Sequence, residues 1–323
     1  MFEIPGLRVG LGGAQMGNLY RAVDDDTARA SFEAAWDGGV RYFDTAPHYG
    51  LGLSERRLGA CLAGRPRDEY VLSAKVGRLL VPSPETAGAR DDQGFDVPAA
   101  YRRVWDFSRD GVLRSLESSL DRLGLDRIDL VYVHDPDDHW DQARREAFPA
   151  LAELRAQGVI GGFGAGMNQS RLLTELVRDV EPDAVMVAGR YTLLEQPAAR
   201  DLLPAALERN VGVMVAGVWN SGLLAVPRPA RDATYNYAPA PPELIDRAHR
   251  LADVCEAHGV TLPEAAVAFP LRHPAVTAVV LGAATAAQVE QNLSRYRAEV
   301  PDGLWSDLAA QGLLPSDASS SPP

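Results

Sequence analysis

Short apolar runs of strand length recur along the chain, and a segment with helical periodicity follows each of them. Continuous apolar runs are typical of strands that are buried on both faces of a parallel sheet. Eight segments fit this pattern: Leu7–Gly13, Val40–Asp44, Tyr70–Lys75, Ile128–His134, Ile160–Gly164, Ala184–Val187, Val211–Ala216 and Thr277–Leu281. The pattern therefore predicts eight buried strands.

The segments between these runs repeat apolar residues at helical spacing. For example, Leu113, Leu116 and Leu120 share one face, and Ser108 is placed to cap the helix that carries them. The predicted helices cover Ala28–Asp37, Ser54–Leu62, Asp110–Leu123, Arg144–Gln157, Gln169–Asp179, Pro197–Arg209, Pro242–His258 and Thr285–Tyr296. Eight strand–helix repeats indicate parallel strands with right-handed crossovers, and they favour a closed (β/α)8 TIM barrel of α/β class.

No change of composition marks a linker, so we expect a single domain over residues 1–312 and a disordered tail over residues 313–323. Two connections, Arg78–Phe107 and Pro227–Pro241, are too long to be simple turns. Long connections in compact domains are usually functional or disordered. Because both follow strands, we expect them to shape a substrate pocket. Four aromatic residues in or near these loops are candidates for its apolar wall: Trp105, Trp140, Trp219 and Tyr235.

Composition narrows the class of protein further. The net charge of −12 and the pI near 5.0 argue against a nucleic-acid-binding surface. Two cysteines are too few for a disulfide framework, which indicates a reducing compartment. No apolar stretch reaches the roughly 18 residues of a membrane helix, and the N-terminus has no signal-peptide pattern. We therefore expect a cytoplasmic protein with a small-molecule substrate, without nucleic-acid or membrane partners.

Four polar residues stand at or just beyond the ends of predicted strands. Asp44, Lys75 and His134 each end an apolar run, and Tyr49 lies in the loop after Asp44. Taken singly, each has an ordinary structural interpretation, as a turn residue or a solvated charge. A barrel of parallel strands, however, assembles its active site at the carboxyl ends of its strands. Their matching placement therefore favours a shared site.

Together these side chains can move a proton to or from a substrate oxygen. A tyrosine hydroxyl has a pKa of about 10, which is too high for efficient base catalysis at neutral pH. The ammonium of Lys75 would stabilise the phenolate of Tyr49 and lower that pKa, and Asp44 would keep the buried lysine charged. His134 could orient a carbonyl or hydroxyl group. None of these groups carries a hydride, so a redox reaction here requires a cofactor.

A metal-dependent barrel hydrolase is a competing interpretation, with His48, His134 and Asp135 as ligands. Such sites usually place two histidines close together at a strand end. The chain contains no His-x-His sequence, and His134-Asp135 is a weak pair. We therefore predict no metal.

Three separated motifs resemble the aldo-keto reductase signature: Arg41–Gly50 continuing through Ser54-Glu55, Leu72–Lys75, and Leu123–His134. The similarity spans nearly the whole chain. It implies a (β/α)8 barrel that binds a nicotinamide cofactor at its C-terminal face.

The resemblance also implies a role for each of the four polar residues. It makes Tyr49 the acid/base, Lys75 and Asp44 the groups that tune it, and His134 the group that orients the substrate. The implied cofactor contacts are Gly13, Ala14, Asp44, Asn168, Asn220, Ser221, Gly222, Leu224, Gly282, Thr285, Gln288 and Asn292. The implied substrate contacts are Tyr49, His134 and Trp219.

The chain departs from the family pattern at two positions beside the expected nicotinamide. Ala188 stands where many members have a glutamine that holds the carboxamide, which leaves Asn168 to bind it. Ala216 stands where many members stack an aromatic ring, a loss that Trp219 could partly cover.

The last predicted strand–helix junction favours NAD over NADP. A helix N-terminus suits a dinucleotide phosphate. Members that prefer NADP usually place arginine or lysine there, and a 2′-phosphate without such a partner is poorly held. The stretch Gly282–Asn292 contains no positive charge. We therefore expect NAD to be preferred, with NADP possible.

Two further stretches, Ala188–Gln196 and Trp219–Leu224, resemble the aldose 1-dehydrogenase subgroup, which includes L-fucose (D-threo-aldose) and L-galactose dehydrogenases. Pyridoxal 4-dehydrogenase is similar too. The resemblance implies oxidation of an aldose to its lactone. A carbonyl or pyridoxal-type enzyme of the same family remains an alternative, as does a non-catalytic subunit that senses the redox state of the cofactor. The intact set of four residues argues against the non-catalytic subunit.

Overall fold

The computed structural model describes residues 1–236 and 238–315, and its centre is a closed barrel of eight parallel strands. The barrel strands are β1 Val9–Gly12, β2 Tyr42–Asp44, β3 Val71–Val76, β6 Ile128–His134, β7 Ile160–Met167, β8 Ala184–Ala188, β9 Gly212–Ala216 and β12 Val276–Gly282. Pairing of β1 with both β2 and β12 closes the barrel. The (β/α)8 prediction is confirmed, and each predicted strand overlaps an observed one.

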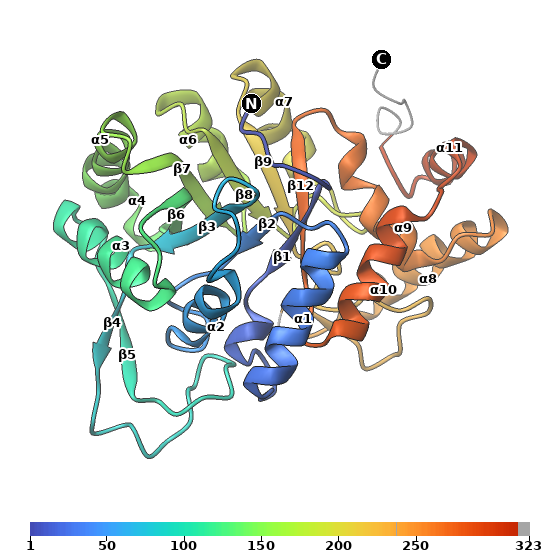
Figure 1. Ribbon diagram of the computed structural model, residues 1–323. Coiled ribbons are helices and arrows are strands. Elements are labelled where there is room, and N and C mark those ends of the chain that lie inside the picture. The colour runs from blue at the N-terminus through green and yellow to red at the C-terminus, as the bar shows by residue number, and fades with distance from the viewer. Residues whose placement is uncertain (237, 316–323) are drawn as a thin grey trace.

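Helices surround the barrel, as Figure 1 shows. Their bounds are α1 Asp25–Asp37, α2 Leu53–Leu62, α3 Arg109–Leu123, α4 Trp140–Gln142, α5 Phe148–Ala156, α6 Arg171–Asp179, α7 Leu202–Glu208, α8 Pro242–Ala257, α9 Leu262–Ala268, α10 Ala286–Arg297 and α11 Asp302–Ala310. Short 3-10 turns lie at Gln15–Gly17, Asp137–His139, Pro197–Ala199 and Pro270–Arg272, and a π-helical turn lies at Ala143–Ala147. Three of these helices were not predicted from the sequence: α4, α9 and α11.

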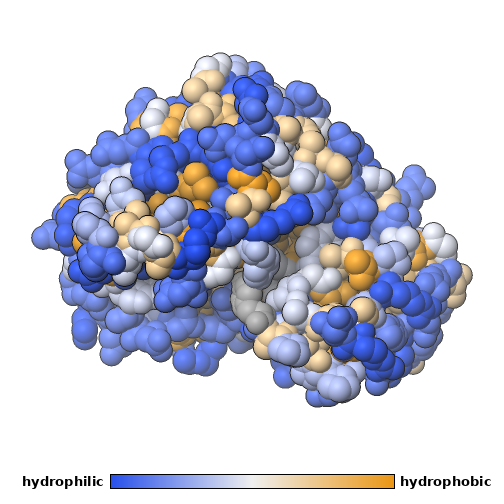
Figure 2. Space-filling view, turned by 90° about the horizontal axis from the view of Figure 1, so that it is seen from below, coloured by the Kyte–Doolittle hydropathy of each residue, from blue (hydrophilic) through white to orange (hydrophobic). Residues whose placement is uncertain are grey.

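Both long connections contain small antiparallel hairpins that periodicity did not predict. In the first, β4 (Arg78–Pro82) pairs with β5 (Tyr101–Trp105). In the second, β10 (Thr234–Tyr235) pairs with β11 (Ala238–Pro239). The β4–β5 hairpin projects below the barrel in Figure 1. Figure 2 views the molecule from this lower side and shows a hollow in a largely hydrophilic face.

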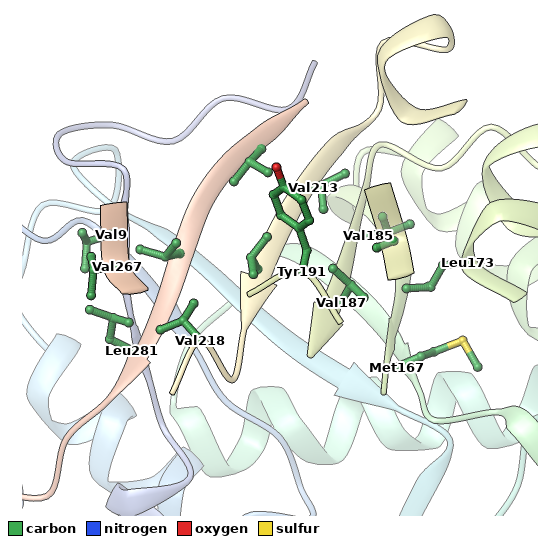
Figure 3. Packing of buried hydrophobic residues seen from close by; sticks show 14 of the residues in the cluster. Val9, Met167, Leu173, Val185, Val187, Tyr191, Val213, Val218, Val267 and Leu281 are labelled. Atoms are coloured by element: carbon green, nitrogen blue, oxygen red, sulfur yellow. The ribbon is translucent and has the colours of Figure 1, made fainter. Parts of the chain in front are cut away.

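Two apolar layers hold the barrel together. The larger one lies between the strands and the helices, and Figure 3 shows part of it, with Val185 and Val187 of β8 and Leu173 of α6 among its members. The smaller one fills the barrel itself, and it includes Tyr42, Leu130, Tyr132, Ala184, Met186, Met214, Ala278 and Val280. Phe2 and Ile4 pack against this inner layer. The interior is therefore a packed core, and room for a ligand exists at the carboxyl ends of the strands.

The C-terminal end of the domain lies slightly beyond the predicted boundary. Leu313 and Leu314 are 1% and 4% exposed and belong to the main core. Arg247 Nη2 also donates to the carbonyl oxygen of Leu313 over 2.6 Å. These two residues therefore pack with the barrel, although the tail was expected to begin at residue 313. The rest of the predicted disordered tail, from Ser316 on, lies outside the described residues. Within the described part of the chain, no helix has the length and apolar character to cross a membrane.

Candidate active site

A cavity of about 820 Å³ opens at the carboxyl ends of the barrel strands. Asp44 ends β2, Lys75 lies one residue before the end of β3, and His134 ends β6. Tyr49 follows β2 in the loop before α2. All four residues line the cavity, so the fold brings together the side chains that the sequence pattern singled out.

Lys75 and Asp44 form a buried ion pair at the base of this cavity. Lys75 Nζ donates to Asp44 Oδ2 over 2.6 Å and to the carbonyl oxygen of Thr45 over 3.1 Å. The two side chains are only 2% and 3% exposed. Burial lowers the pKa of Lys75, but Asp44 and Tyr49 raise it by more, and the net result is a raised pKa. Lys75 is therefore charged at neutral pH, as we expected.

Ser73 fixes the second oxygen of Asp44, a contact that the sequence analysis missed. Ser73 Oγ donates to Asp44 Oδ1 over 2.7 Å, and the Tyr42 hydroxyl lies 3.0 Å from Ser73 Oγ. Ser73 and Lys75 are two residues apart on one strand, so their side chains share a face. The alternation of side chains along β3 could therefore have predicted that Ser73 faces the site.

Tyr49 lies against the ammonium of Lys75, but its pKa is not lowered overall. Lys75 Nζ is 4.7 Å from the centre of the Tyr49 ring. Burial raises the pKa of Tyr49 by more than the charge of Lys75 lowers it, so the net pKa is raised. The expected net lowering is therefore wrong for the protein alone, because the desolvation of the phenol outweighs the nearby charge. Tyr49 is a neutral proton donor at neutral pH, and Lys75 reduces the cost of forming its phenolate.

Two neutral imidazoles complete the polar wall. The centres of the Tyr49 and His134 rings are 5.9 Å apart, and the two rings are nearly perpendicular. Burial, followed by the charges of Arg78 and Lys75, holds the pKa of His134 well below its usual value. Burial and the same cations, together with Arg103, lower the pKa of His48 to about 2. Both rings therefore remain uncharged at neutral pH and can donate one hydrogen bond each.

These histidines do not form a metal site in the described part of the chain. The ring centres of His48 and His134 are 5.6 Å apart, and His134 Nε2 lies 3.7 Å from Asp135 Oδ2. Asp135 instead pairs with Arg78. Among the described residues, no group of three or more His, Cys, Asp or Glu side chains is placed to hold a metal ion.

The first long connection contributes directly to the cavity, as we expected. Gln93 and Phe95, from the segment between β4 and β5, line it. Asn236 from the second connection does the same, together with Arg190 after β8. The role of these four side chains could not be predicted from the sequence, because their placement depends on loop conformation.

The predicted aromatic wall is only partly realised. Trp219 lines the main cavity, and Trp105 lines a neighbouring cleft of about 340 Å³ together with Asp135 and Asn168. Trp140 packs against Phe148 and does not line either space. The hydroxyl of Tyr235 donates to Glu195 at the edge of the site.

Most of the residues implied as cofactor contacts face the cavity. Eight of them line it: Gly13, Ala14, Asp44, Asn168, Asn220, Ser221, Gly222 and Gly282. A Cβ atom at Gly13 would lie 2.6 Å from both the carbonyl oxygen of Asp44 and Ser54 Oγ. Gly13 therefore lets the ends of β1 and β2 meet beside the site. Gln15, which the sequence analysis missed, also lines the cavity, and its side chain packs on Gly282.

Four implied cofactor contacts lie outside this lining. Leu224 is fully buried in the main core, so its side chain is not open to a ligand. The other three brace the junction of β12 and α10. Thr285 caps α10 at the backbone of Gln288, Gln288 Oε1 accepts from the Ala284 backbone, and Asn292 Nδ2 donates to the Gly282 carbonyl.

The chemistry of the cavity fits a dinucleotide. Asn220 Oδ1 is buried and has no hydrogen-bond partner among the described residues, which leaves an acceptor for a ligand amide or hydroxyl. Asn168 adds a second amide to the cavity lining. The N-terminus of α10, next to Gly282, offers backbone N–H groups to a phosphate.

Comparison with known proteins identifies the relatives of the chain. The pattern of the Aldo/keto reductase family matches residues 8–310. D-threo-aldose 1-dehydrogenase from Pseudomonas sp is 52% identical over 316 residues, which cover 97% of this chain and 95% of the relative. Pyridoxal 4-dehydrogenase from Microbacterium luteolum is 40% identical, covering 95% and 94%. L-galactose dehydrogenase from Arabidopsis thaliana is 29% identical, covering 88% and 83%.

Two solved structures superimpose on nearly the whole chain. Glycerol dehydrogenase from Gluconobacter oxydans superimposes with a TM-score of 0.74 at 25% identity and covers 97% of this chain and 96% of its own. An aldo-keto reductase from Bacillus halodurans, in its holo form, has a TM-score of 0.73 at 24% identity, with 97% of each chain covered, and supports the fold.

Proposed function

We propose that this protein, which belongs to the aldo/keto reductase family, oxidises the cyclic hemiacetal of an aldose at C1 to the lactone. Membership makes it an oxidoreductase that uses a nicotinamide cofactor. The observation that carries the proposal is the cavity that gathers Tyr49, Lys75, Asp44 and His134 in a chain 52% identical to an aldose 1-dehydrogenase.

The hemiacetal also links the two most similar relatives named above. Their names give an aldose and pyridoxal as substrates. Both compounds carry an aldehyde and a hydroxyl that can close into a cyclic hemiacetal. Oxidation of that hemiacetal yields a lactone in either case, and one neutral hydrogen-bonding site can serve both. We favour an aldose over pyridoxal as the substrate because the aldose 1-dehydrogenase is more similar to this chain than the pyridoxal dehydrogenase is.

The cavity residues would divide the binding of the cofactor among them. Asn168 and Asn220 would hydrogen-bond polar groups of the nicotinamide half, and the β12–α10 junction would hold the phosphates. When bound, the nicotinamide supplies the hydride acceptor that no side chain here can provide.

The residues of the chain then carry out the proton transfer. Tyr49 hydrogen-bonds the C1 hydroxyl. Its phenol first loses its own proton to solvent, and the phenolate then accepts the proton of the C1 hydroxyl as the C1–O bond gains double-bond character. Lys75 stabilises the phenolate character of Tyr49 in that step, and Asp44 keeps Lys75 charged. Neutral His134 donates to the same oxygen and fixes its orientation. In the reverse direction Tyr49 would return the proton to a reduced carbonyl oxygen.

We retain NAD as the preferred cofactor within this proposal. Two neutral side chains lie at the β12–α10 junction, Ala284 just before α10 and Gln288 in its first turn, and Gln288 is already bonded to the Ala284 backbone. A 2′-phosphate there would meet no positive charge between Gly282 and Asn292. The ratio of kcat/KM with NAD⁺ to that with NADP⁺ measures the preference, and we expect it to exceed one.

The test is oxidation by the purified protein, followed as reduced nicotinamide. The panel contains L-fucose, D-arabinose, L-galactose, pyridoxal and two simple aldehydes, and the product is identified as lactone before it hydrolyses. We expect an aldose to be the best substrate. Turnover of simple aldehydes alone would refute the aldose proposal, and cofactor binding without any turnover would support the non-catalytic alternative. We also place the enzyme in the cytoplasm, in keeping with free Cys61 and Cys255.

A further inference from the structure

His48 lines the cavity beside Tyr49, yet the proton-transfer scheme gives it no task. Its ring centre is 6.0 Å from that of Tyr49 and 5.6 Å from that of His134. Its Nδ1 atom is enclosed and has no hydrogen-bond partner in the described part of the chain. The ring lines the cavity and Nδ1 is enclosed, so Nε2 is the ring nitrogen that remains for a ligand.

Strand β5 and the segment between β4 and β5 hold His48 in place. Arg103 Nη2 donates to the main-chain carbonyl of His48 over 3.0 Å. Asp91 holds Arg103 through two contacts of 2.5 and 3.1 Å, and the two side chains are only 3% and 5% exposed. The ring of Phe95 packs edge-on against the imidazole at 5.1 Å. The imidazole of His48 is thus held at its backbone by Arg103 and at its ring by Phe95. It is preorganised to bind a ligand through its remaining nitrogen.

The electrostatic surroundings decide what His48 offers to a ligand. Burial, with Arg78, Arg103 and Lys75 nearby, lowers the pKa of His48 and keeps the ring neutral. A neutral imidazole carries a single proton. A proton on the enclosed Nδ1 would be a buried donor without an acceptor, which is costly, so Nε2 is the favoured position. His48 thus presents an N–H donor next to the two residues that bind the reacting oxygen.

We propose that His48 is a specificity-determining residue, whose Nε2–H donates to the hydroxyl on the carbon next to the one that is oxidised. This inference rests on the proposed function. Tyr49 and His134 bind the oxygen of the reacting carbon, and the ring of His48 lies close to both of theirs. Its donor is therefore directed to the neighbouring substituent. Simple aldehydes lack that hydroxyl and therefore form no such hydrogen bond with His48.

The experiment compares an aldose with its 2-deoxy counterpart, and D-arabinose and 2-deoxy-D-ribose are the first pair because they differ only in the 2-hydroxyl. Wild type should prefer the hydroxylated sugar by about 10- to 100-fold in kcat/KM. His48→Phe should reduce the preference to within about threefold by slowing the hydroxylated sugar. His48→Gln, which places an amide where Nε2 lies, should keep much of the preference, and His48→Asn, which is too short, should not.

Control variants distinguish a failure of the His48 assignment from a failure of the proposed function. His258→Phe alters a surface histidine paired with Asp307, and it should leave the preference unchanged. An equal loss on both sugars in His48→Phe, or a full preference in that variant, would overturn the role of His48. If His48→Phe does not fold, the Gln and Asn variants decide, and equal preferences in those two would overturn it. A wild type that oxidises no aldose would instead refute the proposed function and this inference with it.

Discussion

At the scale of single residues, Lys75 connects stability to catalysis. Its ion pair with Asp44 is almost completely enclosed, and the same ammonium lies against the ring of Tyr49. Removing one partner of a buried pair leaves an uncompensated charge, whereas removing both does not. Substitutions of Lys75 and Asp44 should therefore separate the contribution of Lys75 to stability from its contribution to catalysis.

Lys75→Met should destabilise the protein by about 3–5 kcal/mol, because Asp44 is left charged and buried. It should also reduce kcat by at least about 100-fold, because the phenolate of Tyr49 loses its stabilising charge. Urea unfolding and steady-state kinetics measure the two effects. The double variant Asp44→Asn with Lys75→Met should regain part of the stability and none of the activity. A double variant no more stable than the single one would contradict this explanation.

A second residue-scale prediction concerns the choice of cofactor. Gln288→Arg places a cation at the start of α10, where the wild-type chain has no positive charge between Gly282 and Asn292. The arginine can pair with a 2′-phosphate, so kcat/KM for NADP⁺ should rise by about tenfold relative to NAD⁺. Gln288→Met, which also removes the bond to the Ala284 backbone, is the matched control. Equal changes with both cofactors in the arginine variant would argue against a phosphate site here.

At the scale of elements, the sequence predicted those parts whose burial repeats along the chain. All eight barrel strands are apolar runs, and Asp44, Lys75 and His134 were found because they end such runs. The β4–β5 hairpin escaped prediction because its strands show no alternation of buried and exposed positions: β4 is mostly half-buried, and β5 is half-buried or exposed. Helix α9 could have been found, since Thr261 and Glu264 form a capping box at its start.

The residues missed in the site have a common physical reason. Gln93 and Phe95 reach the cavity through loop geometry, and Arg103 of β5 supports it through a contact with a distant residue, the bond to the His48 carbonyl. The local spacing of apolar and polar residues does not indicate such long-range contacts. The pKa of Tyr49 was misjudged for a related reason, because the degree of its burial is a property of the assembled cavity.

Close packing between two helices gives a prediction that concerns stability alone. A Cβ atom at Gly59 in α2 would lie 2.0 Å from the carbonyl oxygen of Leu123 at the end of α3. Gly59→Ala should therefore cost about 1–3 kcal/mol, despite the better helix propensity of alanine. Urea unfolding checks this, and kcat of the folded variant should not change. Gly88→Ala is the control, since no atom lies within 4 Å of its Cβ position. A neutral Gly59→Ala would contradict so close an approach of the two helices.

At the scale of the whole molecule, the polar active site affects how stability depends on pH. The folded protein keeps His48 and His134 neutral by burial and by a surrounding set of cations. Their folded pKa values thus lie below the value of about 6.5 in an unfolded chain. Below that pH the unfolded state binds more protons than the folded state, so the free energy of unfolding decreases as the pH falls.

Each of the two histidines should contribute a slope of up to about 1.4 kcal/mol per pH unit as the pH falls from about 6 to 5. Urea unfolding at several pH values measures the total slope. His48→Gln should remove the share of His48, whereas Gly88→Ala, which removes no titratable group, should leave the slope as in wild type. Parallel slopes for wild type and His48→Gln would show that His48 is not held neutral by the fold.

The central claim is that Tyr49 transfers the proton in an NAD-dependent oxidation of an aldose, and Tyr49→Phe tests it most directly. The substitution removes one hydroxyl and leaves the ring that packs against Lys75. We predict that kcat with the best aldose falls by about 10²–10⁴-fold, the usual contribution of a positioned acid/base. The dissociation constant of NAD⁺, measured by fluorescence on the same sample, should change little. Turnover within about tenfold of wild type, with NAD⁺ still bound, would contradict the assignment of Tyr49.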